Sequence, residues 1–335
     1  MSHTVSAASF DTLPEAVRAL ARADFGQVAA RFREAGFTVT LPAKGILSVK
    51  SAEPDPARAS VLLSVGVHGD ETGPIEMVAY ALDALSHSPQ ELALDLMLCV
   101  GSIDAIAVGK RFIDADLNRM FRLQRGDLAA TFEAGRADAI IAATRDFFEG
   151  SGPRRWHLDL HTAIRASRYP KFAIVPQLIA QDARNALIAW LGLAGIEAVI
   201  MNPASAGTYS YWTAEQHGAA ASTVELGRIG TLGRNDLSQF KEASAAIDGL
   251  LRGQPQGGGK PPLVFDTAQS ITKLSEGFRM SFGRETENFT PIKKGEVIAT
   301  DGDTVYTVKH DEEFVVFPNP DVRVVLRAGI MVVRK

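Results

Sequence analysis

The segment VGVHGDETG, residues 65–73, contains two side chains that can bind a metal ion, His68 and Glu71, three positions apart. Imidazole nitrogens and carboxylate oxygens are ligands of zinc, and a catalytic zinc site uses three protein ligands and leaves a fourth position open. Gly66 and Gly69 flank the histidine and allow the backbone to turn sharply, so that both side chains can point to one place. A polar surface loop is the alternative, because a histidine and a glutamate at this spacing are common.

A second candidate is WHLDLHT, residues 156–162. If this segment is a strand, alternation places His157, Asp159 and His161 on one face. His161 then lies at the strand's end, where open α/β sheets carry their ligands. Asp159 can orient a metal-bound imidazole, whereas we expect His157 to be packed inside the protein. A helical pair of histidines is the competing geometry, which the β-prone flanks disfavour.

A third candidate is Glu225 in TVELG, residues 223–227, at the end of another apolar strand. Carboxylates are seldom buried without a partner or a function. A glutamate beside a zinc-bound water can accept its proton and pass it to a leaving amine. The alternative is an ion pair with Arg228.

The segment GKRFIDADLNRMF, residues 109–121, brings Arg111, Asn118 and Arg119 together after a predicted strand. A guanidinium group matches a carboxylate in two-point geometry, and a nearby amide adds another donor. The segment is therefore a candidate for binding an anionic substrate. The alternative is a solvated cluster in which the two aspartates of the segment pair with the arginine.

These residues need a scaffold that brings strand ends together. Apolar runs predict strands, and helical spacing predicts helices at 13–35, 73–85 and 236–251. Apolar strands that alternate with helices indicate an α/β sheet covered on both faces. The predicted strands are a pair within 37–50 and single strands at 59–67, 94–100, 156–161, 172–175, 198–201 and 221–226.

The composition changes near residue 252. The run RGQPQGGGKPP is a poor phosphate-binding loop, because no strand precedes it and prolines follow it, so we interpret it as a flexible connection. Beyond it only short β-type segments occur. The predicted organisation is a helical and strand lead-in (1–44), a zinc-binding catalytic α/β domain (45–252), a linker (253–262) and a C-terminal β domain (263–335).

The overall composition of the 335 residues, with 46% hydrophobic and 22% charged, is that of a globular protein. The net charge of −4 argues against general binding of nucleic acid. Cys99 is the single cysteine, so an intrachain disulfide and a four-thiolate zinc site are excluded, and a reducing cytoplasm is expected. The N-terminus does not resemble a secretory signal, and the most apolar stretch, 187–201, is too short to span a bilayer, so no membrane association is expected.

Taken together, HGDE, DLNRMF, DLHT and VELG, in this order, resemble the succinylglutamate desuccinylase and aspartoacylase family. The resemblance extends from about residue 45 to the C-terminus. It implies a zinc carboxypeptidase-like mixed sheet flanked by helices, followed by a small all-β C-terminal domain. It also implies one zinc ion per chain and a small-molecule substrate. The roles implied are metal binding for His68, Glu71 and His161, general base and acid for Glu225, carbonyl polarisation for Arg111, α-carboxylate binding for Asn118 and Arg119, and support by Asp116 and Asp159.

The stretch DLHTAIRASRYPKF, residues 159–172, looks like the desuccinylase branch of this family, with Arg165 as its marker. The resemblance then implies hydrolysis of N-succinyl-L-glutamate, the last step of arginine catabolism through succinylated intermediates, without a covalent intermediate. The alternatives are an aspartoacylase acting on N-acetyl-aspartate, a carboxypeptidase and a non-catalytic zinc-binding scaffold. A homo-oligomer is compatible with the sequence, which does not specify one.

Overall fold

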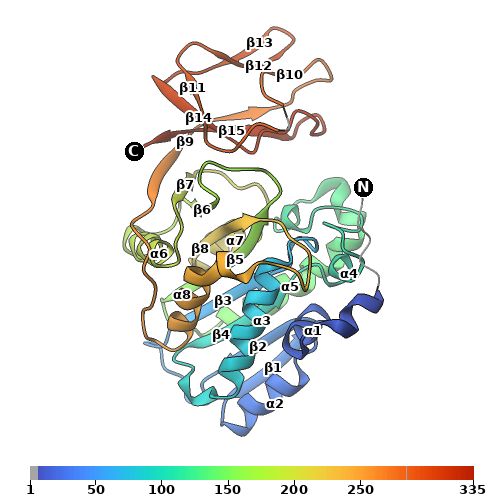
Figure 1. The fold of residues 1–335 in the computed structure, drawn as a ribbon, viewed down its shortest axis with the longest axis vertical. Coiled ribbons are helices and arrows are strands. Elements are labelled where there is room, and N and C mark those ends of the chain that lie inside the picture. Colours follow the sequence, from blue (N-terminus) through green and yellow to red (C-terminus); the bar gives the residue numbers. More distant parts are fainter. Residues whose placement is uncertain (1–6, 284) are drawn as a thin grey trace.

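The computed structural model describes residues 7–283 and 285–335. A twelve-stranded sheet runs through the molecule in the order β1-β2-β4-β3-β5-β8-β6-β7-β9-β15-β14-β11, and a three-stranded sheet of order β10-β12-β13 lies at its C-terminal end (Figure 1). The strands are β1 (Thr38–Ala43), β2 (Ile46–Lys50), β3 (Ser60–Val65), β4 (Asp95–Val100), β5 (Arg155–Ala163), β6 (Lys171–Pro176), β7 (Ala198–Asn202), β8 (Ala220–Arg228), β9 (Leu263–Thr272), β10 (Arg279–Met280), β11 (Thr290–Lys293), β12 (Val297–Asp301), β13 (Thr304–Thr307), β14 (Glu312–Val316) and β15 (Arg327–Arg334).

Helices cover both faces of the first part of the large sheet. The helices are α1 (Glu15–Ala21), α2 (Gly26–Glu34), α3 (Gly73–Ser86), α4 (Ile103–Val108), α5 (Phe132–Phe148), α6 (Gln181–Leu193), α7 (Tyr209–His217) and α8 (Lys241–Leu251). One layer contains α3, which contacts α1, α2 and α8, while α5 and α7 lie behind the sheet in Figure 1 and contact β4 and β5 respectively. The predicted α/β sheet with two helical layers is therefore confirmed.

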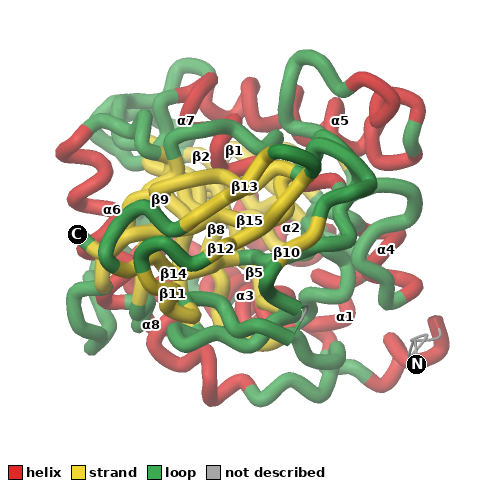
Figure 2. Tube along the Cα trace, turned by 90° about the horizontal axis from the view of Figure 1, so that it is seen from above, coloured by secondary structure: helices red, strands yellow, loops and turns green. Residues whose placement is uncertain are grey.

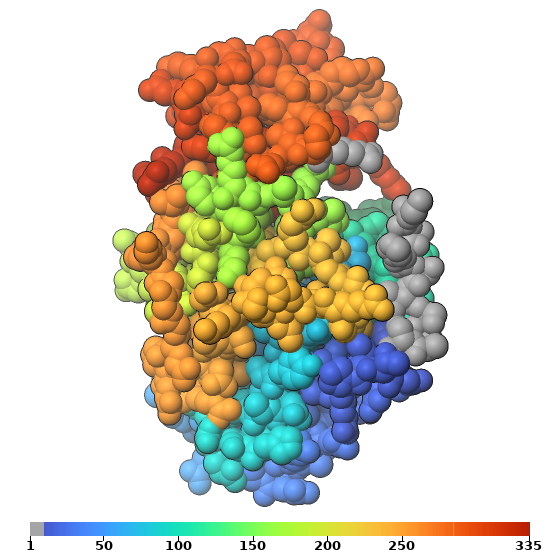
Figure 3. Space-filling model, viewed as in Figure 1, coloured from blue at the N-terminus to red at the C-terminus, as the bar shows by residue number. Residues whose placement is uncertain are grey.

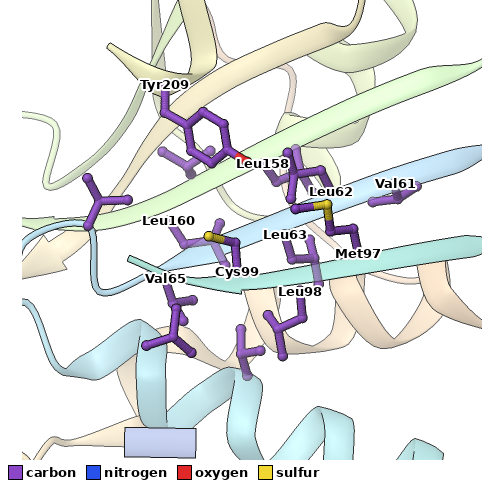
Figure 4. Close-up of a cluster of buried hydrophobic side chains, with 14 of the residues drawn as sticks. Val61, Leu62, Leu63, Val65, Met97, Leu98, Cys99, Leu158, Leu160 and Tyr209 are labelled. Atoms are coloured by element: carbon purple, nitrogen blue, oxygen red, sulfur yellow. The ribbon is translucent and has the colours of Figure 1, made fainter. Parts of the chain in front are cut away.

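The central strands are buried on both faces because they are apolar almost throughout. Every residue of β3 is buried, and β3 pairs in parallel with β4 and with β5, which pairs in parallel with β8. Such continuous apolar runs are typical of parallel strands covered on two sides. In Figure 4, Leu63, Val65 and Leu98 point toward α3, whereas Tyr209 of α7 lies on the opposite side of the strands.

Because β3, β4, β5 and β8 are parallel, the loops that follow them meet at one edge of the sheet. The loop after β3 needs its glycines. Gly66 has a φ of +61°, and a Cβ at Gly69 would lie 2.5 Å from the backbone of Ala105 in α4. A side chain at either position would push this loop away from the sheet edge.

The C-terminal strands form a lobe at one end of the molecule (Figure 3), and in Figure 2, which looks down on that end, they lie in front of the α/β part. β9 pairs in parallel with β7, so the large sheet passes from the α/β part into this lobe without interruption. A hydrophobic core lies across the junction and contains Phe172, Ala198, Ile200, Phe265, Phe289, Val316, Ile330 and Val332. Beyond residue 263 the described part of the chain contains strands and turns only, as predicted.

Two local predictions differ from the structure. The helical spacing of 13–35 is divided between α1 and α2, which are separated by a turn at 22–25 where Ala23 has a φ of +57°. The glycine-rich run is an irregular segment, but it packs closely on the end of α6, and a Cβ at Gly259 would overlap the carbonyl oxygen of Gly192. No helix within the described ranges is both long and apolar enough to cross a membrane.

Candidate metal centre and active site

His68 and Glu71 in the loop after β3 and His161 near the end of β5 meet at the sheet edge, and they are 5%, 3% and 2% exposed. The Nδ1 atoms of His68 and His161 each lie 2.8 Å from an oxygen of Glu71. The two Nδ1 atoms are 3.2 Å apart, close to the roughly 3.3 Å expected between two nitrogen ligands of a tetrahedral zinc ion. The three side chains could hold one metal ion, and their burial excludes the surface-loop alternative.

Each histidine has a carboxylate behind its other ring nitrogen. Asp116 Oδ1 lies 3.0 Å from Nε2 of His68, and Asp159 Oδ2 lies 2.9 Å from Nε2 of His161. Burial opposes protonation of both imidazoles, but the carboxylates around them outweigh it and raise both pKa values above the ordinary value. A hydrogen on Nε2 leaves the lone pair of Nδ1 directed into the cluster, which is the arrangement that a metal-binding histidine needs.

Glu225 lies opposite His161 in the pairing of β5 with β8 and is 8% exposed. Burial, and then the carboxylate of Glu71, raise the pKa of Glu225 to about 7. Its Oε2 has no hydrogen-bond partner among the described residues. The predicted alternative, an ion pair with Arg228, is not among the ion pairs of the described residues, and Arg228 is exposed. A carboxyl group that titrates near neutrality beside this cluster can accept and return a proton.

Arg111, in the loop that follows α4, reaches the same cluster. Its Nη1 donates to Oε1 of Glu71 at 2.7 Å, and its Nη2 lies 3.1 Å from Nε2 of His68. Because 32% of its side chain is exposed, the guanidinium also faces the solvent side of the cluster. The structure therefore brings Arg111 to the place where a polarising cation is expected.

Asn118 and Arg119 lie in the 3-10 turn Leu117–Arg119 beside the cluster. Asn118 is 3% exposed, and its Oδ1 accepts a hydrogen bond from the backbone N–H of Tyr209 at 2.8 Å. Arg119 donates to the carbonyl oxygen of Asn118 at 2.7 Å, and its Nη2 is 3.9 Å from Asp116. The predicted alternative of a self-paired cluster is thus limited to one long contact, and 44% of the Arg119 side chain stays exposed.

Comparison with known protein families gives evidence that does not depend on the geometry of the site. The model of the succinylglutamate desuccinylase/aspartoacylase catalytic domain matches residues 57–251, and that of the barrel-sandwich hybrid domain of the same family matches residues 260–335. The chain belongs to the succinylglutamate desuccinylase/aspartoacylase family. The predicted family is therefore confirmed.

Several members of this family are similar over most of their length. A succinylglutamate desuccinylase of Burkholderia orbicola (strain MC0-3) is 44% identical over 293 residues, which are 86% of this chain and 85% of the relative. The crystal structure of succinylglutamate desuccinylase from Vibrio cholerae has a TM-score of 0.83 and 33% identity, and covers 90% of this chain and 88% of its own. The enzyme from Vibrio parahaemolyticus has a TM-score of 0.82 and 32% identity, with 89% and 88% covered.

Arg165, which was predicted from the sequence as a marker of the desuccinylase branch, lies in the loop after β5 and is partly buried. This loop contacts the C-terminal lobe. The backbone N–H of Asn288 donates to the carbonyl oxygen of Ala166 at 3.0 Å, and the N–H of Arg168 donates to the carbonyl oxygen of Asn288 at 3.1 Å. Asn288 is fully buried and was not predicted from the sequence, because its neighbours along the chain carry no motif.

Glu133, in the first turn of α5, also supports the site and was not predicted from the sequence. Its carboxylate accepts hydrogen bonds from the backbone N–H groups of residues 113–115, the nearest at 2.7 Å, and so holds the loop that carries Arg111. Glu133 is 3% exposed. Helical spacing contains a signal that identifies it, because this glutamate shares the core-facing side of the helix with Ala137, Ile140 and Thr144.

Proposed function

We propose that this protein is a zinc-dependent amidohydrolase that converts N-succinyl-L-glutamate and water to succinate and L-glutamate. The observation that carries the proposal is the buried cluster of His68, Glu71 and His161 with Glu225 beside it. A structural zinc site needs no additional carboxylate that titrates near neutrality, so the pKa of Glu225, raised to about 7 by burial, argues against a non-catalytic scaffold.

The ligand set fits one zinc ion per chain. Two imidazole Nδ1 atoms and one carboxylate converge where the parallel strands end. All three groups are of kinds that zinc accepts as ligands. When bound, zinc acidifies water and polarises a carbonyl group. The reducing environment expected for the single buried Cys99 is compatible with action in the cytoplasm.

The residues of the chain account for the proton transfers. Glu225 accepts a proton at its carboxylate as the water oxygen forms a bond to the amide carbon. The guanidinium of Arg111 stabilises the negative charge that develops on the carbonyl oxygen, and one such donor is commonly worth about 3 kcal/mol. Glu225 then returns the proton to the amide nitrogen as the C–N bond breaks, which leaves the amine of glutamate and the acyl carboxylic acid. The remaining proton of the acid passes to the amine, so the products are the acyl carboxylate and the ammonium form of glutamate.

The cations around the cluster and the named relatives support a substrate that carries several carboxylates. We assign binding of the α-carboxylate to Arg119, which is exposed beside the cluster, and to Asn118, whose Oδ1 is held by the backbone N–H of Tyr209. A succinyl group carries a second carboxylate, which needs a cation, because burying an unpaired charge is costly. Arg165, four residues after His161, is the residue that we assign to it.

A panel of N-acyl amino acids tests the proposal. We expect succinyl-glutamate to exceed acetyl-glutamate and acetyl-aspartate by well over about tenfold in kcat/KM, because a site's unpaired polar groups penalise the analogue that lacks their partner. Arg165→Ala should reduce that ratio without loss of zinc, whereas Arg168→Ala, an exposed arginine of the same loop, should not. A wild-type preference for acetyl-aspartate would replace this proposal with an aspartoacylase.

A further inference from the structure

A row of polar side chains, joined by one ion pair and three hydrogen-bond contacts, leads from His161 into the interior of the protein. Asp159 Oδ2 lies 2.9 Å from His161, and Asp159 Oδ1 accepts a hydrogen bond from Ser64 at 2.5 Å. Ser64 Oγ is 2.8 Å from Nε2 of His157, whose Nδ1 is 2.8 Å from Oγ1 of Thr213. This buried relay joins β5, β3 and α7, and each of its five members is at most 2% exposed.

The surroundings of the relay are apolar. Ser64 interrupts the apolar run of β3, and His157 lies opposite Leu62 in the pairing of β3 with β5. The ring of His157 packs edge-on against Tyr209, with the ring centroids 4.3 Å apart. Polar groups in such a place destabilise the fold unless each is hydrogen-bonded. Apolar residues would fill these positions more favourably if packing were the only requirement.

The hydrogens available to the relay indicate which atom donates in each of its hydrogen bonds. Burial lowers the pKa of His157 to about 4, so its imidazole is neutral near pH 7 and has a single N–H. The carboxylate of Asp159 only accepts, so the hydroxyl hydrogen of Ser64 is directed to it. Ser64 must then accept from Nε2–H of His157, and Nδ1 of His157 is left as an acceptor for Thr213. The single hydroxyl hydrogen of Thr213 is shared between this nitrogen and the carbonyl oxygen of Ser210, which lies 2.9 Å from Oγ1.

The carboxylate of Asp159 influences which ring nitrogen of His161 has the hydrogen. One oxygen of Asp159 is occupied by Ser64, and the other lies 2.9 Å from Nε2 of His161, where its negative charge favours a hydrogen on that nitrogen. Nδ1, which lies 2.8 Å from Glu71 and 3.2 Å from Nδ1 of His68, is then the ring nitrogen left to bind a metal ion. The second ligand is supported differently, because Asp116 accepts a hydrogen bond from the backbone N–H of Asn118 at 2.8 Å, and the side chain of Arg119 is 3.9 Å away. Side-chain substitution can therefore disturb the support of His161 without disturbing that of His68.

We propose that Ser64 and His157 are positioning residues that act through Asp159 and hold His161 in the tautomer and orientation that bind the metal ion. The inference rests on the proposed function only in requiring that His161 is a metal ligand. Its consequence is specific to metal binding: loss of the relay should weaken the site even where the fold is intact.

The test compares zinc affinity among folded variants. Ser64→Ala removes the donor to Asp159, and His157→Met removes both ring nitrogens at similar volume. Both should raise the dissociation constant of zinc by about 10–100-fold, the usual effect of losing a group behind a metal ligand. They should also alter the visible absorption spectrum of the cobalt-substituted protein. His157→Gln, which keeps an N–H donor and an acceptor, should recover most of the affinity.

Ser222→Ala is the matched control, because Ser222 is fully buried in the neighbouring strand β8 and lies outside the relay. It should bind zinc like the wild type. Affinity is measured by competition with a chromophoric chelator, and thermal melting of the metal-free proteins is recorded in parallel. Ser64→Ala deletes one atom and keeps the test usable if His157→Met does not fold.

The outcomes separate the two proposals. Folded Ser64→Ala and His157→Met proteins with wild-type zinc affinity and an unchanged cobalt spectrum would overturn the relay, even if their melting temperatures fall, and would leave the proposed function standing. A wild-type protein that binds no zinc would overturn the proposed function and the relay with it.

Discussion

At the scale of single residues, Glu225 combines burial with a carboxylate neighbour, and these two effects on its pKa outweigh those of the nearby His161, His68 and Arg111. It is 8% exposed, its Oε2 has no hydrogen-bond partner among the described residues, and Glu71 lies close enough to add a like charge. A group in this position is costly to ionise and therefore basic once it is ionised. The same environment that makes Glu225 suitable for proton transfer should make it unfavourable for stability.

The catalytic part of this argument predicts the behaviour of Glu225→Gln. The amide is isosteric but cannot carry a proton, so kcat should fall by about 10²–10⁴-fold, the usual contribution of a general acid–base group. Zinc content, measured by elemental analysis, should stay near one per chain. Glu215→Gln, which changes an exposed glutamate of α7, serves as the control. A loss of less than about tenfold would show that Glu225 is not the base.

The stability part concerns the metal-free protein. The pKa of Glu225 is raised in the folded state from 4.5 to about 7, so its stabilising contribution is complete below pH 4.5 and is lost as the pH rises through about 7. Glu225→Gln lacks this dependence. The free energy of unfolding of Glu225→Gln should therefore exceed that of the wild type by an amount that grows across this pH range, up to about 3 kcal/mol. Urea denaturation of both proteins at several pH values measures it, and a difference that does not change with pH would contradict the assignment.

At the scale of elements, the site depends on loops that other elements hold in place. The loop of Arg111 has its backbone N–H groups bound by Glu133 of α5, which fixes where the arginine leaves the backbone. The loop of His68 is held against α4 through Gly69. Catalytic geometry is thus set by contacts between elements that the reacting groups do not touch.

Glu133→Gln tests the first of these contacts. The amide nitrogen would face backbone donors, so the free energy of unfolding should fall by about 1–3 kcal/mol. Because the loop loses its anchor, kcat/KM should also fall, by up to about 10²-fold, as small displacements of a catalytic group can cause. Asp138→Asn on the same helix, whose side chain is 69% exposed, should change neither quantity. Unchanged kinetics in Glu133→Gln would mean that Arg111 is positioned by other contacts.

At the scale of the whole molecule, one sheet and one hydrophobic core join the two parts of the chain. β9 pairs with β7, and Phe289 from the C-terminal lobe packs against Phe172 of β6, with ring centroids 5.3 Å apart. The lobe also contacts the loop that contains Arg165, through Asn288. The C-terminal lobe therefore contributes to the shape of the site rather than being joined to it by a loose tether.

Phe289→Ala tests whether the α/β part and the C-terminal lobe unfold together. The residue is fully buried, and removing a buried phenylalanine costs about 3–5 kcal/mol. Because the core crosses the junction, calorimetry should show a single transition at lower temperature. Phe132→Ala, at a residue that is 55% exposed, should shift the melting temperature little. Two separate transitions, with that of the α/β part unchanged, would contradict a shared core.

The sequence by itself predicted the central strands, in their order along the chain, and the candidate residues of the metal centre. Apolar runs bounded by glycine and proline predicted the central strands, and the placement of His68, His161 and Glu225 at strand ends predicted a common edge. These features are local, since the pattern of apolar residues specifies each strand and its ends directly. The family resemblance was confirmed for the same reason, because each of the four motifs is a short continuous segment. HGDE follows β3, DLNRMF follows α4, and DLHT and VELG lie near the ends of β5 and β8.

Only the tertiary structure decided the contacts between distant segments. The division of 13–35 into two helices, the close packing of the glycine-rich run on α6 and the binding of the Arg111 loop by Glu133 depend on neighbours far along the chain. The same holds for His157, which the sequence predicted to be packed but whose hydrogen bond to Ser64 requires the register of β3 on β5. A pattern along the chain records which residues are buried, whereas the partners of a buried polar group are set by how the elements meet.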